Sequence, residues 1–280
     1  MDIILFIKKI ILAIIQGIAE VLPISSSGHL LISSEILNVE TQGLQFIIFL
    51  HFGSLVAMVV YYWKDLMNIL FSLCRFIFKK DREENTLFNC RLFVNLIIAS
   101  IPAAILGILF SDIIDEYLSN LYFVFSFLII TGCLLLINRN LNGTKTLKEM
   151  TALDALTVGS FQCVGILPGI SRSGSTIFGG KVTKLSNEAA ANFSFLMFLP
   201  VTAGSFLIEV VKEFDTIIAT EPINLLLDAI IVIISGIVTF LAVKFIFKLI
   251  KKGKLHYFAY YCFAIALIGI IICVCTGYGF

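Results

Sequence analysis

The chain has 280 residues and a net charge of +1, with 59% hydrophobic and only 14% charged residues, and its mean hydropathy of +1.02 is too high for a soluble domain with a polar surface. The near-neutral charge excludes a broad basic field of the kind that attracts nucleic acid. Seven cysteines lie mostly in apolar runs without paired Cys-x-x-Cys spacing, so neither a zinc site nor a disulfide framework is expected.

The apolar segments follow the same order twice along the chain. A broken stretch near 3–37, interrupted by Leu-Pro-Ile-Ser-Ser-Ser-Gly-His-Leu, precedes uninterrupted spans near 44–63, 90–110 and 118–138. A second broken stretch near 152–185, interrupted by Leu-Pro-Gly-Ile-Ser-Arg-Ser-Gly-Ser-Thr, precedes spans near 189–210, 224–250 and 256–276. About 20 helical residues cross the hydrocarbon core, and a broken backbone at that depth must be satisfied by protein or a polar cavity. The sequence therefore predicts an all-α polytopic membrane protein with six transmembrane helices and two re-entrant helical hairpins.

Charges in the connections predict the orientation of these spans. Lysine and arginine gather near 75–91, 139–148 and 248–254, and the positive-inside rule assigns these connections to the cytoplasm. The acidic connections at 111–117 and 211–223 then lie outside. On this count the first hairpin opens from the outside and the second from the cytoplasm, so their tips face each other.

The two hairpin tips also resemble each other. Gln16–Gly28 and Gln162–Gly174 align without a gap, with Gln, Ile, two Ser and Gly identical. Similar broken hairpins inserted in opposite directions are typical of an inverted-topology repeat with a site near the midplane. We therefore expect one membrane domain over 1–280, with repeats of about 1–140 and about 150–280.

The candidate site lies at these tips. Glu20 and Arg172 would each cost about 2.5 to 3.5 kcal/mol to insert into bare hydrocarbon, so both are functional-site candidates. A purely structural ion pair is the alternative, but it would not need the hydroxyls and the histidine around it. The remaining polar candidates are Gln16, Ser25, Ser26, Ser27, His29, Ser171, Ser173 and Thr176.

These residue types suit the transfer of a phosphoryl group. Glu20 can take a proton or hold a divalent cation, and Gln16, four residues earlier, shares its helical face. The planar fork of Arg172 matches phosphate oxygens, and the Gly-Ser turns offer backbone N–H groups to an anion. Ser26 and His29 are candidates for nucleophile and acid/base.

On these motifs the sequence resembles the undecaprenyl-diphosphate phosphatases of the bacitracin-resistance family. That family is marked by (Glu/Gln)-x-x-x-Glu, here Gln16–Glu20, running into Pro-x-Ser-Ser-x-Gly-His, here Pro23–His29. Its second motif, Pro-Gly-x-Ser-Arg-Ser-x-x-Thr, is complete at Pro168–Thr176. The resemblance extends over nearly the whole chain. Position 16 is Gln, so Glu20 is the only acidic residue of the first motif.

The resemblance implies hydrolysis of undecaprenyl diphosphate to the monophosphate and phosphate at the outer face of the bacterial plasma membrane. This reaction recycles the carrier lipid of peptidoglycan synthesis and confers bacitracin resistance. It also implies a divalent cation, magnesium or calcium, with Glu20 as ligand. By motif position Glu20, Ser26, His29 and Arg172 become catalytic, while Gln16, Ser25, Ser27, Ser171, Ser173 and Thr176 bind substrate. The expected partners are this lipid and the surrounding membrane, and a homodimer is left open.

Two other functions compete with this interpretation. A transporter that flips a polyprenyl phosphate would also use an inverted repeat with broken helices, but it has no use for a nucleophile and a proton relay. A structural scaffold would not explain a buried Arg172. Another family of membrane lipid phosphatases is rejected because no spaced histidine and aspartate follow Ser171 and Arg172. The identity of the nucleophile, whether Ser26, His29 or water, stays open.

Overall fold

The computed structural model describes residues 3–39, 44–212, 214 and 222–277, and every named element within them is helical. The first half holds α1 (Ile3–Ala19), α2 (Ser26–Leu37), α3 (Leu44–Tyr61), α4 (Trp63–Phe78), α5 (Glu84–Leu118) and α6 (Leu121–Asn140). After a short 3-10 helix, η1 (Leu147–Glu149), come α7 (Ala152–Val164), α8 (Arg172–Val182), α9 (Asn187–Lys212), α11 (Pro222–Lys251) and α12 (Tyr257–Thr276).

The two predicted broken stretches are confirmed as pairs of short helices. α1 ends at Ala19 and α2 begins at Ser26, while α7 ends at Val164 and α8 begins at Arg172. The proline in each gap explains the break, because its ring removes a backbone donor and clashes with the preceding turn. Apart from Gln16, which lies in the last turn of α1, the polar residues of both motifs therefore lie in the gaps or near the starts of α2 and α8.

The long helices agree with the predicted spans only in part. In the part of the chain that is described, five helices are long and apolar enough to cross a membrane, namely α5, α6, α9, α11 and α12. The span expected at 44–63 coincides with α3, which passes as a sixth only together with α4, from which it is bent by 70°. A membrane protein with five or six crossing helices is therefore what the structure supports.

Several predicted connections proved to be helical. The connection expected at 75–91 is reduced to 79–83, because α4 runs to Phe78 and α5 begins at Glu84. The one expected at 111–117 lies within α5, and most of the predicted 211–223 connection lies outside the described residues. Charge patterning marks where a segment leaves the hydrocarbon, but a helix can continue into water because its backbone hydrogen bonds are internal.

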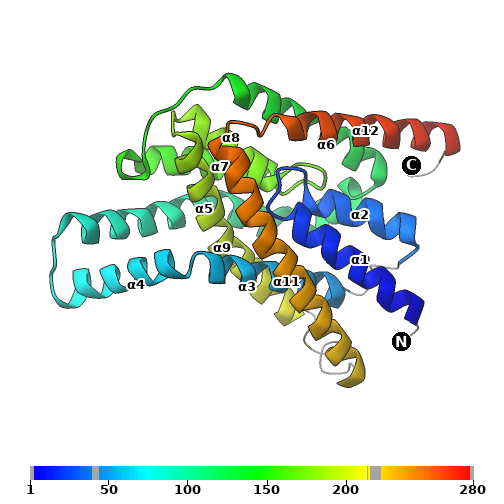
Figure 1. The fold of residues 1–280 in the computed structure, drawn as a ribbon, viewed down its shortest axis with the longest axis horizontal. Helices are drawn as coiled ribbons and strands as arrows, with labels where there is room; N and C mark the ends of the chain where they lie inside the picture. Colours follow the sequence, from blue (N-terminus) through cyan, green and yellow to red (C-terminus); the bar gives the residue numbers. More distant parts are fainter. Residues whose placement is uncertain (1–2, 40–43, 213, 215–221, 278–280) are drawn as a thin grey trace.

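The packing places both gaps at the centre of the molecule. In Figure 1, α3, α9 and α11 cross in the middle, and α6 and α12 run along one edge in contact with each other. α1 packs on α11, while α7 packs on α5. The core contains fully buried Phe193 and Met197 of α9 and Met58 of α3. These helices hold the gap after α1 against the gap after α7.

Candidate active site

The two gaps touch each other through a serine and two glycines. The Ser25 hydroxyl accepts a hydrogen bond from the Gly169 N–H at 3.0 Å, across 144 residues of sequence. A Cβ on Gly28 would lie 3.1 Å from the Gly169 Cα, and one on Gly169 would lie 2.4 Å from the Val124 carbonyl oxygen. Gly169 also has a φ of 100°, which favours glycine. The two hairpin tips are therefore in direct contact, as the sequence predicts.

Ser25 and Ser171 cap the two helices that begin at the site. The Ser25 hydroxyl accepts from the Gly28 N–H at 3.3 Å, and the Ser171 hydroxyl accepts from the Gly174 N–H at 3.0 Å. Ser25 has a φ of 71°, a left-handed conformation that is strained for serine and tends to occur at functional sites. Two helix N-termini therefore meet at the gaps, and such termini favour anions.

Glu20 and Arg172 form the charged centre of the site. Arg172 Nη2 donates to Glu20 Oε1 at 2.6 Å, and Gln16 Nε2 donates to Glu20 Oε2 at 2.7 Å. The Glu20 side chain is 1% exposed, whereas the Arg172 side chain is 28% exposed. The carboxylate is thus enclosed, while the guanidinium still has an accessible side that can meet a substrate.

Two residues that the sequence did not single out hold Arg172 in place. Its Nη1 donates to the Thr202 hydroxyl at 3.0 Å, and its guanidinium lies over the Phe198 ring at 4.6 Å from the centroid. Phe198 and Thr202 are four residues apart on α9 and so share a face. A threonine one turn after a phenylalanine in an apolar helix is too common a pattern to have revealed this role.

The predicted hydroxyl residues fall into two groups. Ser26, the first residue of α2, is half-buried and interacts with Glu20. Ser27 is exposed, with its hydroxyl 3.4 Å from that of Ser25. The second group is buried within the packing: Ser173 lies 3.2 Å from the Ser171 hydroxyl, and Thr176 donates to the Arg172 carbonyl at 2.9 Å.

Histidines occupy two sides of the site. His29 points toward Tyr261 of α12, with its Nε2 2.8 Å from the Tyr261 hydroxyl. His51 of α3, which lies outside both motifs, is within electrostatic range of Glu20. Another residue missed from the sequence is Thr131 of α6, whose hydroxyl donates to the Gly169 carbonyl at 2.9 Å and accepts from the Ser171 N–H at 3.0 Å.

The donor set at Glu20 suits a cation that shares its ligands with a substrate. Among the described residues there is no group of three or more His, Cys, Asp or Glu that could hold a metal on its own. Gln16 Oε1, however, is buried without a hydrogen-bond partner and lies on the amide that contacts Glu20. Magnesium is commonly bound by one or two protein oxygens together with substrate phosphates. Glu20 and Gln16 fit that pattern.

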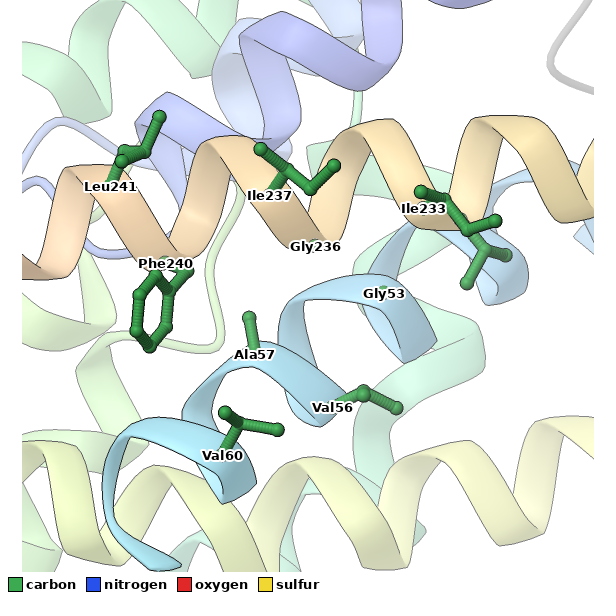
Figure 2. A pocket seen from close by; sticks show the side chains of 10 residues that line it. Gly53, Val56, Ala57, Val60, Ile233, Gly236, Ile237, Phe240 and Leu241 are labelled. Carbon is green, nitrogen blue, oxygen red and sulfur yellow. The ribbon is translucent and has the colours of Figure 1, made fainter.

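An apolar groove of about 320 Å³ lies between α3 and α11 (Figure 2). Gly53 and Gly236 face each other between the two helices, and Val56, Ile237 and Phe240 lie along the groove. Its lining contains only apolar side chains and glycines. His51 lies two residues before Gly53 on α3, so the two residues point to opposite sides of this helix.

Comparison with known proteins places this site in a family. Residues 9–268 match the family described as bacitracin resistance protein BacA. The chain belongs to this family. It is 38% identical to the undecaprenyl-diphosphatase of Halothermothrix orenii over 96% of this chain and 98% of that protein. It is equally identical to those of Thermosipho africanus, over 95% and 99%, and Methanococcus vannielii, over 93% and 97%. Within this BacA chain the matched region includes both gaps and all ten predicted site residues.

Proposed function

We propose that this protein is an enzyme that hydrolyses undecaprenyl diphosphate to undecaprenyl phosphate and inorganic phosphate. Relatives that match nearly the whole chain are named undecaprenyl-diphosphatase. The observation that carries the proposal is the Glu20–Arg172 pair, enclosed where two helix N-termini meet. Carrier-lipid recycling and bacitracin resistance would follow from this activity.

Arg172 is the phosphate clamp in this proposal. Its Thr202 and Phe198 contacts hold the guanidinium plane, so the Nη2 now bonded to Glu20 can turn to a phosphate oxygen with little loss of side-chain freedom. Positive charge and N–H groups placed before the reaction stabilise the charge that develops on the transferred phosphoryl group. The N-termini of α2 and α8 add to this field.

Glu20 and Gln16 would hold the divalent cation, magnesium or calcium. When bound, the cation neutralises diphosphate charge and polarises the bond to be broken. When Arg172 turns from Glu20 to the substrate, Glu20 Oε1 loses its hydrogen-bond donor and becomes available to the cation. Gln16 supplies a second oxygen, Oε1, which has no hydrogen-bond partner. The Glu20 carboxylate therefore serves both as partner of Arg172 and as ligand.

Ser26 is the nucleophile that the geometry favours. Ser26 interacts with Glu20, whereas His29 Nε2 faces Tyr261. In this mechanism Ser26 Oγ forms a bond to the terminal phosphorus and its proton passes to His29, while the bridging P–O bond breaks and undecaprenyl phosphate leaves. Water then cleaves the phosphoserine and releases phosphate. Direct attack by water would form no phosphoserine, so trapping a phosphate on Ser26 decides between the two routes.

The polyprenyl tail is proposed to lie between helices, with its first isoprene units in the groove between α3 and α11. The groove is apolar throughout and runs along α3, which carries His51 on its opposite side. A long apolar chain bound there would pass around α3 for its diphosphate to reach the charged centre. Undecaprenyl diphosphate has this combination of a tail and a polar head.

An inverted repeat is proposed for the whole membrane domain, with repeats of about 1–140 and about 150–280 and two re-entrant hairpins, α1–α2 and α7–α8. Reciprocal packing supports it, since α1 lies on α11 as α7 lies on α5. Gly132 of α6 faces Phe263 of α12, and Gly269 of α12 faces Phe125 of α6. We place the protein in the bacterial plasma membrane with the site open to the outer face. The homodimer stays a prediction.

Release of phosphate from undecaprenyl diphosphate by the purified, detergent-solubilised protein tests the proposal. We expect cation-dependent release that a chelator abolishes and that is lost in Glu20→Gln and Arg172→Ala. Glu84→Gln, at an exposed carboxylate, is the matched control and should retain activity. A folded wild-type protein that releases no phosphate but moves polyprenyl phosphate across liposome membranes would replace the enzyme by a transporter.

A further inference from the structure

His29 is held between a backbone carbonyl and a tyrosine from the far end of the chain. Its Nδ1 lies 2.8 Å from the Ser25 carbonyl oxygen, and its Nε2 lies 2.8 Å from the Tyr261 hydroxyl. The two rings also stack, with centroids 5.5 Å apart and planes inclined by 15°. His29 is buried, whereas Tyr261 is 40% exposed on α12. One side chain thus both bonds and covers the imidazole.

The chemistry of these contacts fixes where the imidazole proton lies. A carbonyl oxygen can only accept, so the Nδ1 that faces Ser25 must carry hydrogen. In a neutral imidazole Nε2 is then an acceptor, and the Tyr261 hydroxyl must donate to it. Without the tyrosine, Nε2 would have no donor among the contacts of His29 described here, and the ring would lose the stacking surface that sets its plane.

We propose that Tyr261 is the positioning residue that sets the ring orientation of His29 in the active site, while the Ser25 carbonyl sets its tautomer. The inference rests on the proposed function, in which His29 handles a proton. Nε2 already accepts the Tyr261 hydrogen, so the hydroxyl fixes the direction from which a proton can reach this nitrogen, as an acid/base residue requires. Tyr261 acts through His29, so it is not itself a catalytic residue.

Removal of the hydroxyl alone tests this role. Tyr261→Phe keeps the ring and its stacking, and we expect kcat to fall about 10-fold to 100-fold with KM nearly unchanged, a part of what acid/base catalysis contributes. In a His29→Gln background the same change should have no further effect on kcat. Tyr260→Phe, the adjacent and more exposed tyrosine of α12, is the matched control and should match the wild type.

A measurement without turnover separates this inference from the proposed function. In protein labelled with ¹⁵N at its three histidines, the His29 ring signals should report hydrogen on Nδ1 in both proteins, and the Nε2 signal should shift in Tyr261→Phe because its hydrogen bond is lost. Phosphate release by the wild type together with an unchanged spectrum and unchanged kcat in Tyr261→Phe would overturn the inference. If the wild type releases no phosphate, the proposed function fails, yet the spectra still decide whether Tyr261 bonds and orients His29.

Discussion

Arg172 and Glu20 are 152 residues apart in sequence and only 2.6 Å apart in space, where Nη2 of one meets Oε1 of the other. Glu20 is the first residue of one proline-containing break and Arg172 is the first residue after the other, and each would be unfavourable in the membrane without its partner. The pair neutralises the site while it is free of substrate. A substrate phosphate must therefore compete with Glu20 for the guanidinium.

Arg172 should be the most sensitive single position of the phosphate-binding half. We expect Arg172→Ala to lower kcat/KM by about 10²- to 10³-fold, as loss of a preorganised transition-state donor does. The kcat/KM of Arg172→Lys should lie between those of Arg172→Ala and the wild type. A lysine ammonium keeps the positive charge, but it cannot donate to Thr202 and to a phosphate in one plane as the guanidinium does. Kinetics with undecaprenyl diphosphate measure both. Near-normal turnover in Arg172→Ala would refute the clamp.

Gln16 should tune the response to the divalent cation. Gln16→Glu adds a second carboxylate next to Glu20, so half-maximal activity should be reached at a lower cation concentration. Gln16→Leu removes Oε1, which has no hydrogen-bond partner, and should raise the cation concentration needed for half-maximal activity. Titration of magnesium and calcium into chelator-treated protein gives the values. Identical curves for all three proteins would exclude a ligand at position 16.

The groove between α3 and α11 should matter for long substrates only. Val56 is 43% exposed and lines the groove, so Val56→Trp fills the space with little disturbance of the core. We expect KM for undecaprenyl diphosphate to rise several-fold while KM for a short-chain diphosphate, such as farnesyl diphosphate, changes little. Ile268→Trp, at an exposed position of α12, controls for a bulky residue elsewhere. Equal effects on both substrates would argue against a tail site.

A second ion pair should matter for stability and not for chemistry. Lys9 Nζ of α1 lies 3.2 Å from Asp228 Oδ1 of α11, with side chains 19% and 8% exposed. Asp228→Leu leaves the lysine without its partner, and loss of one member of a buried pair costs about 3 to 5 kcal/mol. The double variant Lys9→Met, Asp228→Leu should regain much of this stability, because neither charge then stays unpaired.

Thermal unfolding in detergent, followed by a thiol-reactive dye, measures this effect. Cys262 and Cys273 are buried and become reactive as the helices separate. The midpoint of the single variant should fall well below that of the double variant, while phosphate release per folded molecule stays similar. A double variant no more stable than the single one would contradict the pairing argument.

Local signals in the sequence determined the class of the protein and most of its charged centre. Apolar runs report the helices that lie in lipid, and prolines with small polar residues mark the two breaks, because backbone hydrogen-bonding rules act within a few residues. The charged candidates Glu20 and Arg172 were recognisable one at a time, since an ionisable residue in an apolar run is costly wherever it occurs. Their family motifs then pointed to a phosphatase.

Tertiary structure decided which of these residues meet and what supports them. The supporting residues come from helices whose sequences are plainly apolar. They are Thr202 and Phe198, which contact Arg172, Thr131, which lies between the gaps, and Tyr261, which contacts His29. The helix α4 after the span predicted at 44–63, and the extension of α5 beyond 90–110, were hidden for a similar reason: a helix satisfies its own backbone on both sides of the membrane boundary. Contacts between residues 30 to 232 positions apart depend on how the helices pack, and a local pattern carries no information about that packing.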